Sequence, residues 1–397
     1  MHIGVAGPCS LGPLAEWLRE RDLADLPATH SFPQIGELAA NYLRRGHRVS
    51  VYTSSFALHD TLRLDCGPLK LRIVPRRVSR RSLALSLFAE ERKRLHAEMQ
   101  CDKPDVIHAH WLYEYAWSAL AYSRSAVVTA HDGPVSVLRY YHHPDWLFRE
   151  GMSLRTLREA EIVTAVNPEL AAELAPFRGR SRTPVVIVPN GIDRPQELLQ
   201  PGADPADGAI TWVSIASGVD HRKNTSTALR AFAIARQHLG DESRLLMVGA
   251  GHEADGPAQR WCEAKGISTT GVSFMGVLPH DEVLEILERS SVGLLHTSRW
   301  EACSVAILEA QARGVPVIGG EASGGVPSSL AGGAAGRLVD VRSPEAVADA
   351  LRELSRESSV YNSLAEAGVR NIRERYTLDS VCDSYLGLLE ANAGVRK

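Results

Sequence analysis

Short, continuously apolar segments recur along this chain of 397 residues, and a helical pattern separates each segment from the next. The apolar segments are rich in β-branched residues, and most of them do not alternate apolar with polar positions. A strand in a parallel sheet that is covered on both faces has this character, because neither face meets water. Strand, helix and strand in repetition therefore predict an α/β fold of doubly wound parallel sheets.

The alternation runs through the chain twice. In the first half the expected strands are Ile3–Gly7, Arg48–Thr53, Leu71–Pro75, Asp105–His110, Ala126–His131, Ile162–Asn167 and Val185–Pro189. In the second half they are Ile210–Ile215, Leu245–Gly249, Val272–Gly276, Val292–His296, Val315–Gly319 and Arg337–Asp340. The helical patterns between and after them include Ile35–Arg45, Thr225–Gln237, Ser304–Arg313 and Leu378–Asn392.

A turn signal, Pro189-Asn190-Gly191-Ile192-Asp193, separates the two sets of strands and opens a polar, Pro/Gly-rich stretch to residue 208. We predict two Rossmann-like domains, over residues 1–189 and 190–376, that face each other across a cleft. A C-terminal helix is expected over residues 377–397, and a return to the first domain is one option for it. Ligands of such folds bind beyond the carboxyl ends of the strands, so the cleft is the expected site.

Composition excludes several classes of protein. The formal net charge of −3 gives no overall signal for a nucleic-acid partner. The six cysteines include no C-x-x-C pair, so neither a zinc site nor a disulfide framework is expected. Reduced thiols in a cytoplasmic protein are the simplest interpretation. The N-terminal sequence lacks a signal-peptide pattern, and no segment is apolar for long enough to span a bilayer.

The segment Trp300–Gly314 is an apolar helical pattern that carries two carboxylates, Glu301 and Glu309. A carboxylate in an apolar segment is costly unless a partner binds it. Ser304 is the expected N-cap, so the amides of Cys303, Ser304 and Val305 form an anion site at the helix N-terminus. Glu309 suits a ribose, because a vicinal diol donates two hydrogen bonds and a carboxylate accepts two.

A structural explanation is equally good for this segment alone. Glu309 and Arg313 are four residues apart and could form a salt bridge on the helix surface. Glu301 could simply favour the helix N-terminus through its charge.

Other residues at strand ends add candidates. Arg222 and Lys223 follow the first strand of the second half and could hold a diphosphate, although a solvated basic loop is the alternative. Gly249 and Gly251 follow the next strand as a candidate phosphate loop. In the first half, His131 ends a strand, and Gly12 lies in the loop after the first strand.

The first half also contains a basic cluster, Arg76, Arg77, Arg80 and Arg81, followed by leucines and Phe88. Such a cluster suits the anionic inner face of a membrane or a lipid-diphosphate acceptor. An ordinary amphipathic helix with a solvated basic face is the alternative. Aromatic residues within 111–117 and 140–146 could stack on sugar rings or pack the domain.

In their order along most of the chain, these motifs resemble those of retaining glycosyltransferases of the GT-B fold, in the large family-four group. The most specific match is the pair Glu301 and Glu309, with seven residues between them, and Pro189-Asn190-Gly191-Ile192-Asp193 upstream. The other matching segments are Leu38–Val49, Pro104–His110, Thr129–His131, Arg222–Asn224, Val248–Gly251, Phe274–Gly276 and Gly324–Pro327.

The resemblance implies a role for each candidate. Glu309 would bind the ribose of a nucleotide-sugar donor, while Glu301 and His131 would contact the donor sugar. Lys223 and the amides of residues 303–305 would hold the diphosphate. Arg222 would replace a family arginine whose position is Gly218 in this chain.

The remaining donor-side roles fall on glycines and backbone groups. The segment that contains Met275 and Gly276 would present backbone groups to the nucleobase. The Gly12 loop would lie against the phosphates. Such enzymes need no metal or other cofactor, because positive side chains and helix amides stabilise the leaving diphosphate. The first domain would bind a glycan or lipid-linked acceptor, and no acceptor-binding residue is predicted.

Two alternatives stay open at this stage. A nucleotide-sugar epimerase of the same architecture would need further acid–base groups, and His108, His110 and Asp132 could supply them. A non-catalytic sugar-nucleotide-binding homologue is also compatible with the altered arginine position. The resemblance favours a transferase in polysaccharide or glycoconjugate biosynthesis.

Overall fold

The computed structural model describes residues 1–18, 25–29, 32–179, 183–193, 210–239, 241–289 and 291–393. The chain divides into two compact units, which are described separately. Unit 1 comprises Met1–Gly191 and Leu378–Lys397, and unit 2 comprises Ile192–Thr377. Most of the Pro/Gly-rich stretch before residue 210 lies outside the described residues.

Among the described residues, unit 1 contains an eight-stranded sheet in the order β3-β4-β2-β1-β5-β6-β7-β8. Its strands are β1 His2–Ala6, β2 Arg48–Ser55, β3 Leu62–Cys66, β4 Leu69–Pro75, β5 Val106–His110, β6 Val127–Ala130, β7 Ile162–Ala165 and β8 Val186–Ile187. Neighbouring strands pair in parallel except β3, which runs antiparallel to β4 at the sheet edge. Strands β1, β5 and β6 are buried along their whole length, as expected for parallel strands that are covered on both faces.

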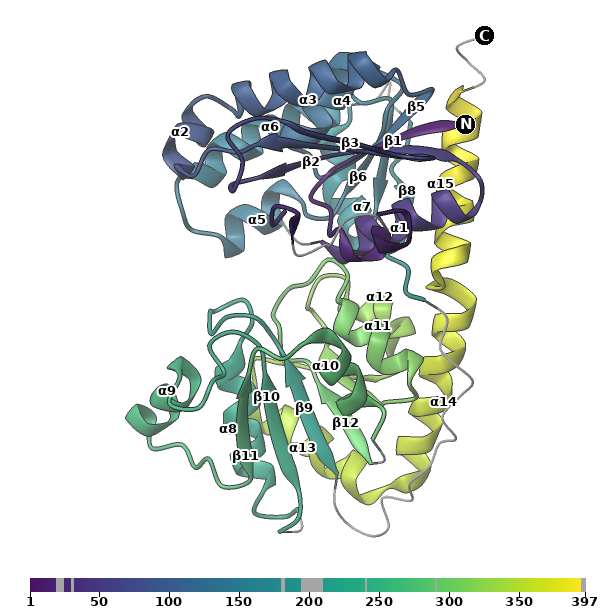
Figure 1. Cartoon of the computed structure of the whole chain (residues 1–397). Helices are drawn as coiled ribbons and strands as arrows, with labels where there is room; N and C mark the ends of the chain where they lie inside the picture. The colour runs from purple at the N-terminus through teal and green to yellow at the C-terminus, as the bar shows by residue number, and fades with distance from the viewer. Residues whose placement is uncertain are drawn as a thin grey trace. The chain divides into compact units, whose positions relative to one another are not determined.

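The α-helices of unit 1 cover this sheet (Figure 1). They are α1 Pro33–Arg44, α2 Arg80–Leu85, α3 Ala89–Asp102, α4 Glu114–Tyr122, α5 Pro134–Tyr140, α6 Asp145–Glu159, α7 Pro168–Leu174 and α15 Leu378–Ala393. Two short 3₁₀ helices, Gly12–Trp17 and Ala175–Phe177, complete the described helical segments of the unit.

The C-terminal helix α15 packs on α1 as part of unit 1 (Figure 1). Its residues Val381, Tyr385 and Leu389 lie one turn apart and are buried in the same core as β1 and α1. The Tyr385 hydroxyl accepts a hydrogen bond from Thr129 Oγ1 on β6 at 3.3 Å. Burial of this apolar stripe explains why the last helix belongs with the first residues of the chain.

Unit 2 contains a six-stranded parallel sheet in its described part, in the order β11-β10-β9-β12-β13-β14. Its strands are β9 Thr211–Ile215, β10 Arg244–Val248, β11 Val272–Gly276, β12 Val292–Leu295, β13 Val317–Gly320 and β14 Arg337–Val339. Its helices are α8 Thr225–Ala235, α9 Pro257–Lys265, α10 His280–Leu287, α11 Val305–Ala312, α12 Val326–Ser329, α13 Pro344–Arg356 and α14 Ser358–Arg375, with a 3₁₀ turn at Ala331–Gly333.

Both sheets confirm the predicted α/β class. The sequence patterns did not predict β3 or α14. Strand β3 alternates exposed and buried residues at an edge, so its sequence lacks the continuous apolar character on which the prediction relied. The predicted strands otherwise begin or end within two residues of the observed ones. No helix among the described residues is both long and apolar enough to cross a membrane.

Candidate functional site

Two positively charged side chains of unit 2 converge on one carboxylate oxygen, that of Glu301. Lys223 Nζ donates a hydrogen bond to Glu301 Oε1 at 2.6 Å, and Arg222 Nη1 donates to the same oxygen at 3.1 Å. Each of the three side chains is less than a fifth exposed. The structure thus brings together Glu301 and the two predicted diphosphate-binding cations, which lie 78 and 79 residues away in sequence.

The charges in this cluster determine its ionisation. Burial by itself would raise the pKa of Glu301, but the charges of Lys223 and Arg222 outweigh burial and hold the pKa below its usual value. Burial lowers the pKa of nearby His296 to about 4, and Lys223 and Arg222 act in the same direction. At neutral pH the site therefore contains an ionised carboxylate, two cations and a neutral imidazole.

Glu309 lies on α11 and has a different partner. Its Oε1 atom is 2.7 Å from Nε2 of His280, the first residue of α10. The salt bridge between Glu309 and Arg313 that the spacing allowed is absent from the described structure. The Arg313 guanidinium instead bonds to Glu288 at 3.1 Å and to the main-chain carbonyl of Glu309. The predicted structural explanation for Glu309 is therefore wrong.

Helix α11 begins where the sequence predicted. Ser304 is its N-cap residue by backbone position, although its hydroxyl makes no capping hydrogen bond. The amides of the first turn lie next to Val305 at the positive end of the helix dipole. The segment Cys303–Val305 is packed beside the apolar side chains of Leu308 and Ile372.

Close packing explains the glycines of the predicted phosphate loop, Gly249 and Gly251. Gly249 has φ +120°, and a Cβ atom there would lie 2.0 Å from the carbonyl oxygen of Ala216. Its amide donates to the Gly276 carbonyl at 2.7 Å, while the Gly251 amide donates to the Glu253 carboxylate at 3.0 Å. Both amides thus have partners within the fold, and a role for this loop in binding phosphate remains a prediction.

The end of β11, which was predicted to bind a nucleobase, is partly exposed. Met275 is 42% exposed, and Gly276 is buried with φ +66°. The segment leads through Pro279 directly into His280, so the partner of Glu309 follows the predicted base-binding strand.

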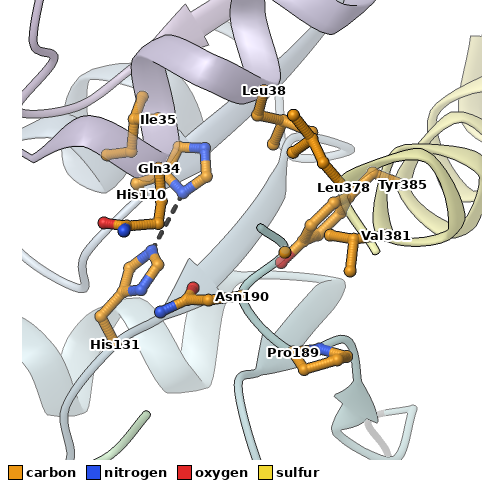
Figure 2. A pocket seen from close by; sticks show the side chains of 11 residues that line it. Gln34, Ile35, Leu38, His110, His131, Pro189, Asn190, Leu378, Val381 and Tyr385 are labelled. Atoms are coloured by element: carbon orange, nitrogen blue, oxygen red, sulfur yellow. Dashed lines mark hydrogen bonds between the residues drawn. The ribbon is translucent and has the colours of Figure 1, made fainter. Parts of the chain in front are cut away.

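In unit 1, His131 follows β6 and pairs with His110 at the end of β5. The distance from His131 Nε2 to His110 Nδ1 is 3.1 Å (Figure 2). Burial lowers the pKa of His131 to about 3, and burial also lowers the pKa of His110, with a smaller effect from the neighbouring histidines. Both rings are neutral at physiological pH, so one ring donates its N–H to the other.

A pocket opens beside these two histidines (Figure 2). Its lining residues are Gln34, Ile35, Leu38, His110, His131, Pro189, Asn190, Gly191, Leu378, Val381 and Tyr385. Among the described residues, His110 Nε2 and His131 Nδ1 are buried and have no hydrogen-bond partner. The pocket therefore combines apolar walls with polar groups that could bind a hydroxyl-bearing ligand.

The loop after β1 meets this region through a residue that the sequence did not single out. A Cβ atom at Gly7 would lie 2.9 Å from Ile35 and 3.1 Å from His110, two residues that line the pocket. Gly12 begins the first 3₁₀ helix, and a Cβ atom there would meet nothing within 4 Å. Packing thus explains Gly7, and the phosphate role of Gly12 stays a prediction.

The basic cluster that was predicted to face a membrane is largely neutralised within unit 1. The Arg76 side chain is only 9% exposed and donates to Glu114 at 2.9 Å. Arg77 pairs with Glu91 at 2.7 Å, and Arg80 pairs with Asp145 at 3.1 Å. Arg81 is exposed. The prediction of an exposed cluster is wrong for Arg76, because the fold buries this side chain against a carboxylate, and membrane contact remains a prediction.

A second buried charged group lies near the end of β6. The Tyr113 hydroxyl is 3.2 Å from Asp132 Oδ1 and 3.0 Å from Glu150 Oε1. The Arg149 guanidinium stacks over the rings of Tyr113 and Trp146. These contacts show that the aromatic residues of this region pack around charges as well as around each other.

Sequence reasoning missed His280, Gln34 and Glu150 as members of these sites. A histidine at a strand–helix junction was a visible signal for His280, but nothing in the sequence paired it with Glu309. Among the residues that the structure describes, no three His, Cys, Asp or Glu side chains converge as a metal site requires. Metal independence stays a prediction.

Two family profiles match this chain. The profile described as Glycosyltransferase Family 4 matches residues 34–195, and the profile described as Glycosyl transferases group 1 matches residues 211–371. The first match lies almost wholly in unit 1 and the second lies in unit 2.

Several characterised proteins are similar along most of their length. N-acetyl-alpha-D-glucosaminyl L-malate synthase of Bacillus anthracis is 25% identical over 301 residues, which cover 72% of this chain and 74% of that protein. D-inositol 3-phosphate glycosyltransferase of Mycolicibacterium smegmatis is 25% identical over 386 residues, covering 88% and 84%.

Solved structures share the fold at lower identity. Sucrose-phosphate synthase from Thermosynechococcus elongatus superposes with a TM-score of 0.76 at 18% identity and covers both chains completely. Anabaena HepE, crystallised with UDP and glucose, gives a TM-score of 0.66 at 15% identity and covers 98% of this chain and 100% of its own.

Proposed function

Because this chain belongs to the family-four glycosyltransferases of the GT-B fold, we propose that it transfers a sugar from a nucleotide-sugar donor with retention of anomeric configuration. The acceptor would be a glycan or a lipid-linked sugar, and the reaction would need no metal. Polysaccharide or glycoconjugate synthesis would be the context.

The observation that carries this proposal is that Lys223 and Arg222 both bind Glu301, which lies three residues before the N-cap of α11. Two cations and a helix N-terminus can stabilise the charge that a nucleoside diphosphate gains as it leaves the sugar. The arginine fork and the compact ammonium both form short, charge-assisted hydrogen bonds to phosphate oxygens. These groups would replace the cation that other transferases use.

Glu309 would anchor the nucleoside. Its carboxylate has one described side-chain partner, His280, which uses one of about four lone-pair positions on the two oxygens. The remaining positions can accept the two hydrogen bonds that a ribose diol donates. A carboxylate that is 14% exposed on a helix beside an accessible strand end suits this role.

In unit 1, His131 would contact the donor sugar. The neutral imidazole can donate to or accept from a sugar hydroxyl but is a poor general base, because burial lowers its pKa to about 3. The departing phosphate oxygen would take the proton of the acceptor hydroxyl. Leaving and attacking groups would then lie on the same face of the sugar, which gives retention.

Binding of nucleoside diphosphates tests the proposal first. Thermal unfolding would be measured with UDP, GDP, ADP and dTDP, since a ligand at a hundred times its dissociation constant stabilises the folded state by about 2.7 kcal/mol. We expect one or more of these nucleotides to raise the melting temperature of the wild type by more than that of Glu309→Gln. The absence of any effect from all four nucleotides would overturn the proposal.

Products from the selected donor test the chemistry. The corresponding nucleotide-sugar would be incubated with an acceptor panel, and the anomeric configuration of any product would be read by proton NMR. A product with the donor's configuration supports retention, whereas an inverted product refutes it. Conversion of the donor to an isomer without acceptor would instead indicate an epimerase.

A further inference from the structure

Glu301 binds both Lys223 and Arg222, the two cations that are predicted to hold a diphosphate. Both cations donate to the same oxygen, Oε1, at 2.6 and 3.1 Å. These are distances of charge-assisted hydrogen bonds, the same kind that each cation would form with a phosphate. The carboxylate is thus an internal anion within the predicted diphosphate subsite.

The backbone around Glu301 is fixed, so only side chains need to move for the partners to change. The Glu301 amide donates to the Ser323 carbonyl, and the Glu301 carbonyl accepts from the Gly325 amide at 2.7 Å. Gly324 between them has φ +65°, and a Cβ atom there would lie 2.6 Å from the Glu301 carbonyl oxygen. These contacts oppose a shift of the loop backbone, whereas rotation of the Glu301 side chain leaves all the backbone hydrogen bonds intact.

Electrostatic repulsion would act between Glu301 and a bound diphosphate. Two cations and one carboxylate give the cluster a net charge of +1. A diphosphate would bring further negative charge within a few ångström of the Glu301 carboxylate, and like charges in a partly buried site repel strongly.

We propose that Glu301 is the exchangeable counter-ion of the diphosphate subsite: a phosphate oxygen of the donor replaces it on Lys223 and Arg222, and the released carboxylate turns to the hydroxyls of the donor sugar. This inference rests on the proposed function and adds a second role for Glu301. Donor binding and the sugar contact become one coupled event, because the carboxylate reaches the sugar only after the diphosphate has displaced it.

Inorganic pyrophosphate is the probe, because it reports on the diphosphate subsite without a nucleoside. Its affinity would be measured by titration calorimetry for the wild type, Glu301→Gln and Glu309→Gln. We expect Glu301→Gln to bind pyrophosphate at least about ten-fold more tightly, since the competing charge is gone. Sugar transfer by this variant should nevertheless fall, because the carboxylate that contacts the sugar is also gone.

Glu309→Gln is the matched control. It makes the same chemical change eight positions further along the chain, at a carboxylate that bonds to His280 and not to the two cations. Its affinity for pyrophosphate should equal that of the wild type, while its affinity for the nucleoside diphosphate should fall. Pyrophosphate therefore distinguishes the two glutamates, because Glu301→Gln should bind it more tightly than the wild type and Glu309→Gln should not.

A second pair of variants, Lys223→Gln and the double variant Lys223→Gln with Glu301→Gln, tests the proposal if Glu301→Gln alone does not fold. Lys223→Gln alone removes a cation and should weaken pyrophosphate binding. Lys223→Gln combined with Glu301→Gln removes one charge of each sign and should bind pyrophosphate more tightly than Lys223→Gln alone. This comparison measures the competition directly as a coupling between the two positions.

Unchanged or weaker pyrophosphate binding by Glu301→Gln, together with no recovery in the double variant, would overturn the proposal. Glu301 would then orient the cations for the diphosphate instead of competing with it. Failure of the proposed function has a different signature: neither pyrophosphate nor any of the four nucleoside diphosphates would bind to any variant.

Discussion

Replacing Glu150 with glutamine should make the protein more stable at alkaline pH. Glu150 is 3% exposed, and its Oε1 atom and Asp132 Oδ1 both face the hydroxyl of Tyr113. One hydroxyl proton can be donated to only one of the two acids. Burial, and then the charge of Asp132, raise the pKa of Glu150 to about 8. Burial also raises the pKa of Asp132, to about 6.

The size of the effect follows from linkage. The ordinary pKa of a glutamate is 4.5, so between about pH 4.5 and pH 8 the folded protein binds a proton that the unfolded chain has lost. Stability therefore falls as the pH rises through this window, by at most about 1.4 kcal/mol per pH unit, and Glu150 contributes no further change above pH 8. The whole window corresponds to an upper limit of roughly 5 kcal/mol, which coupling to Asp132 reduces.

Urea unfolding of wild type and Glu150→Gln at several pH values from 5 to 9 provides the assay. The carboxamide keeps the shape of the side chain and cannot ionise. The variant's advantage in unfolding free energy should therefore grow by roughly 2 kcal/mol or more between pH 5 and pH 8. The control is Glu159→Gln on the same helix, where the carboxylate is 47% exposed and pairs with Arg155.

Parallel stability curves for wild type and Glu150→Gln would refute the reasoning. They would mean that Glu150 titrates in the folded protein as it does in the unfolded chain, and that the cluster around Tyr113 admits water or a counter-charge. An equal dependence on pH of the difference in unfolding free energy between Glu159→Gln and the wild type would also refute the reasoning, because the effect would then not depend on burial.

Two further predictions concern Gly191 and His280. A Cβ atom at Gly191 would lie 2.8 Å from Leu378 Cα, so Gly191→Ala should destabilise the folded state by about 1–3 kcal/mol and lower the melting temperature. The control is Gly387→Ala, where the added Cβ atom would meet nothing within 4 Å and the melting temperature should not fall. Equal losses in the two variants would contradict the packing argument. His280→Ala removes the described side-chain partner of Glu309 and should weaken nucleoside diphosphate binding about five-fold, the effect of one ordinary hydrogen bond, with no change for pyrophosphate. Calorimetry with both ligands checks this, and an equal loss for pyrophosphate would show that His280 acts elsewhere.

Much of the fold could be read from local patterns. Strands such as β6 and β12 are buried on both faces, so nearly every position in them is apolar, and this continuous pattern is visible in the sequence. Helix α11 was predicted within a residue at each end, because Ser304 and Gly314 mark its limits. The edge strand β3 has one solvated face, and its short alternating sequence resembles a loop.

The candidate site could be predicted only in part. The resemblance selected Glu301, Glu309 and Lys223, and the structure places Glu301 and Lys223 in direct contact. It could not select His280, since a lone histidine has no distinctive neighbour in sequence. The i, i+4 rule suggested Arg313 as the partner of Glu309, but the Arg313 side chain donates to Glu288, the residue directly after α10.

The sequence by itself determined which segments become strands and helices, because burial on two faces, helix periodicity and chain-turn residues are local properties. It also supplied the candidate site residues, whose roles stay predictions. Only the tertiary structure decided how the charges are paired. The sequence alone left Arg76 open to a membrane or a ligand. In the fold this side chain instead binds Glu114, which is 38 residues away in sequence. Glu301 likewise met its two cations only when β9 and β12 paired in one sheet. Ion pairs over such separations depend on strand order and register, which no local pattern encodes.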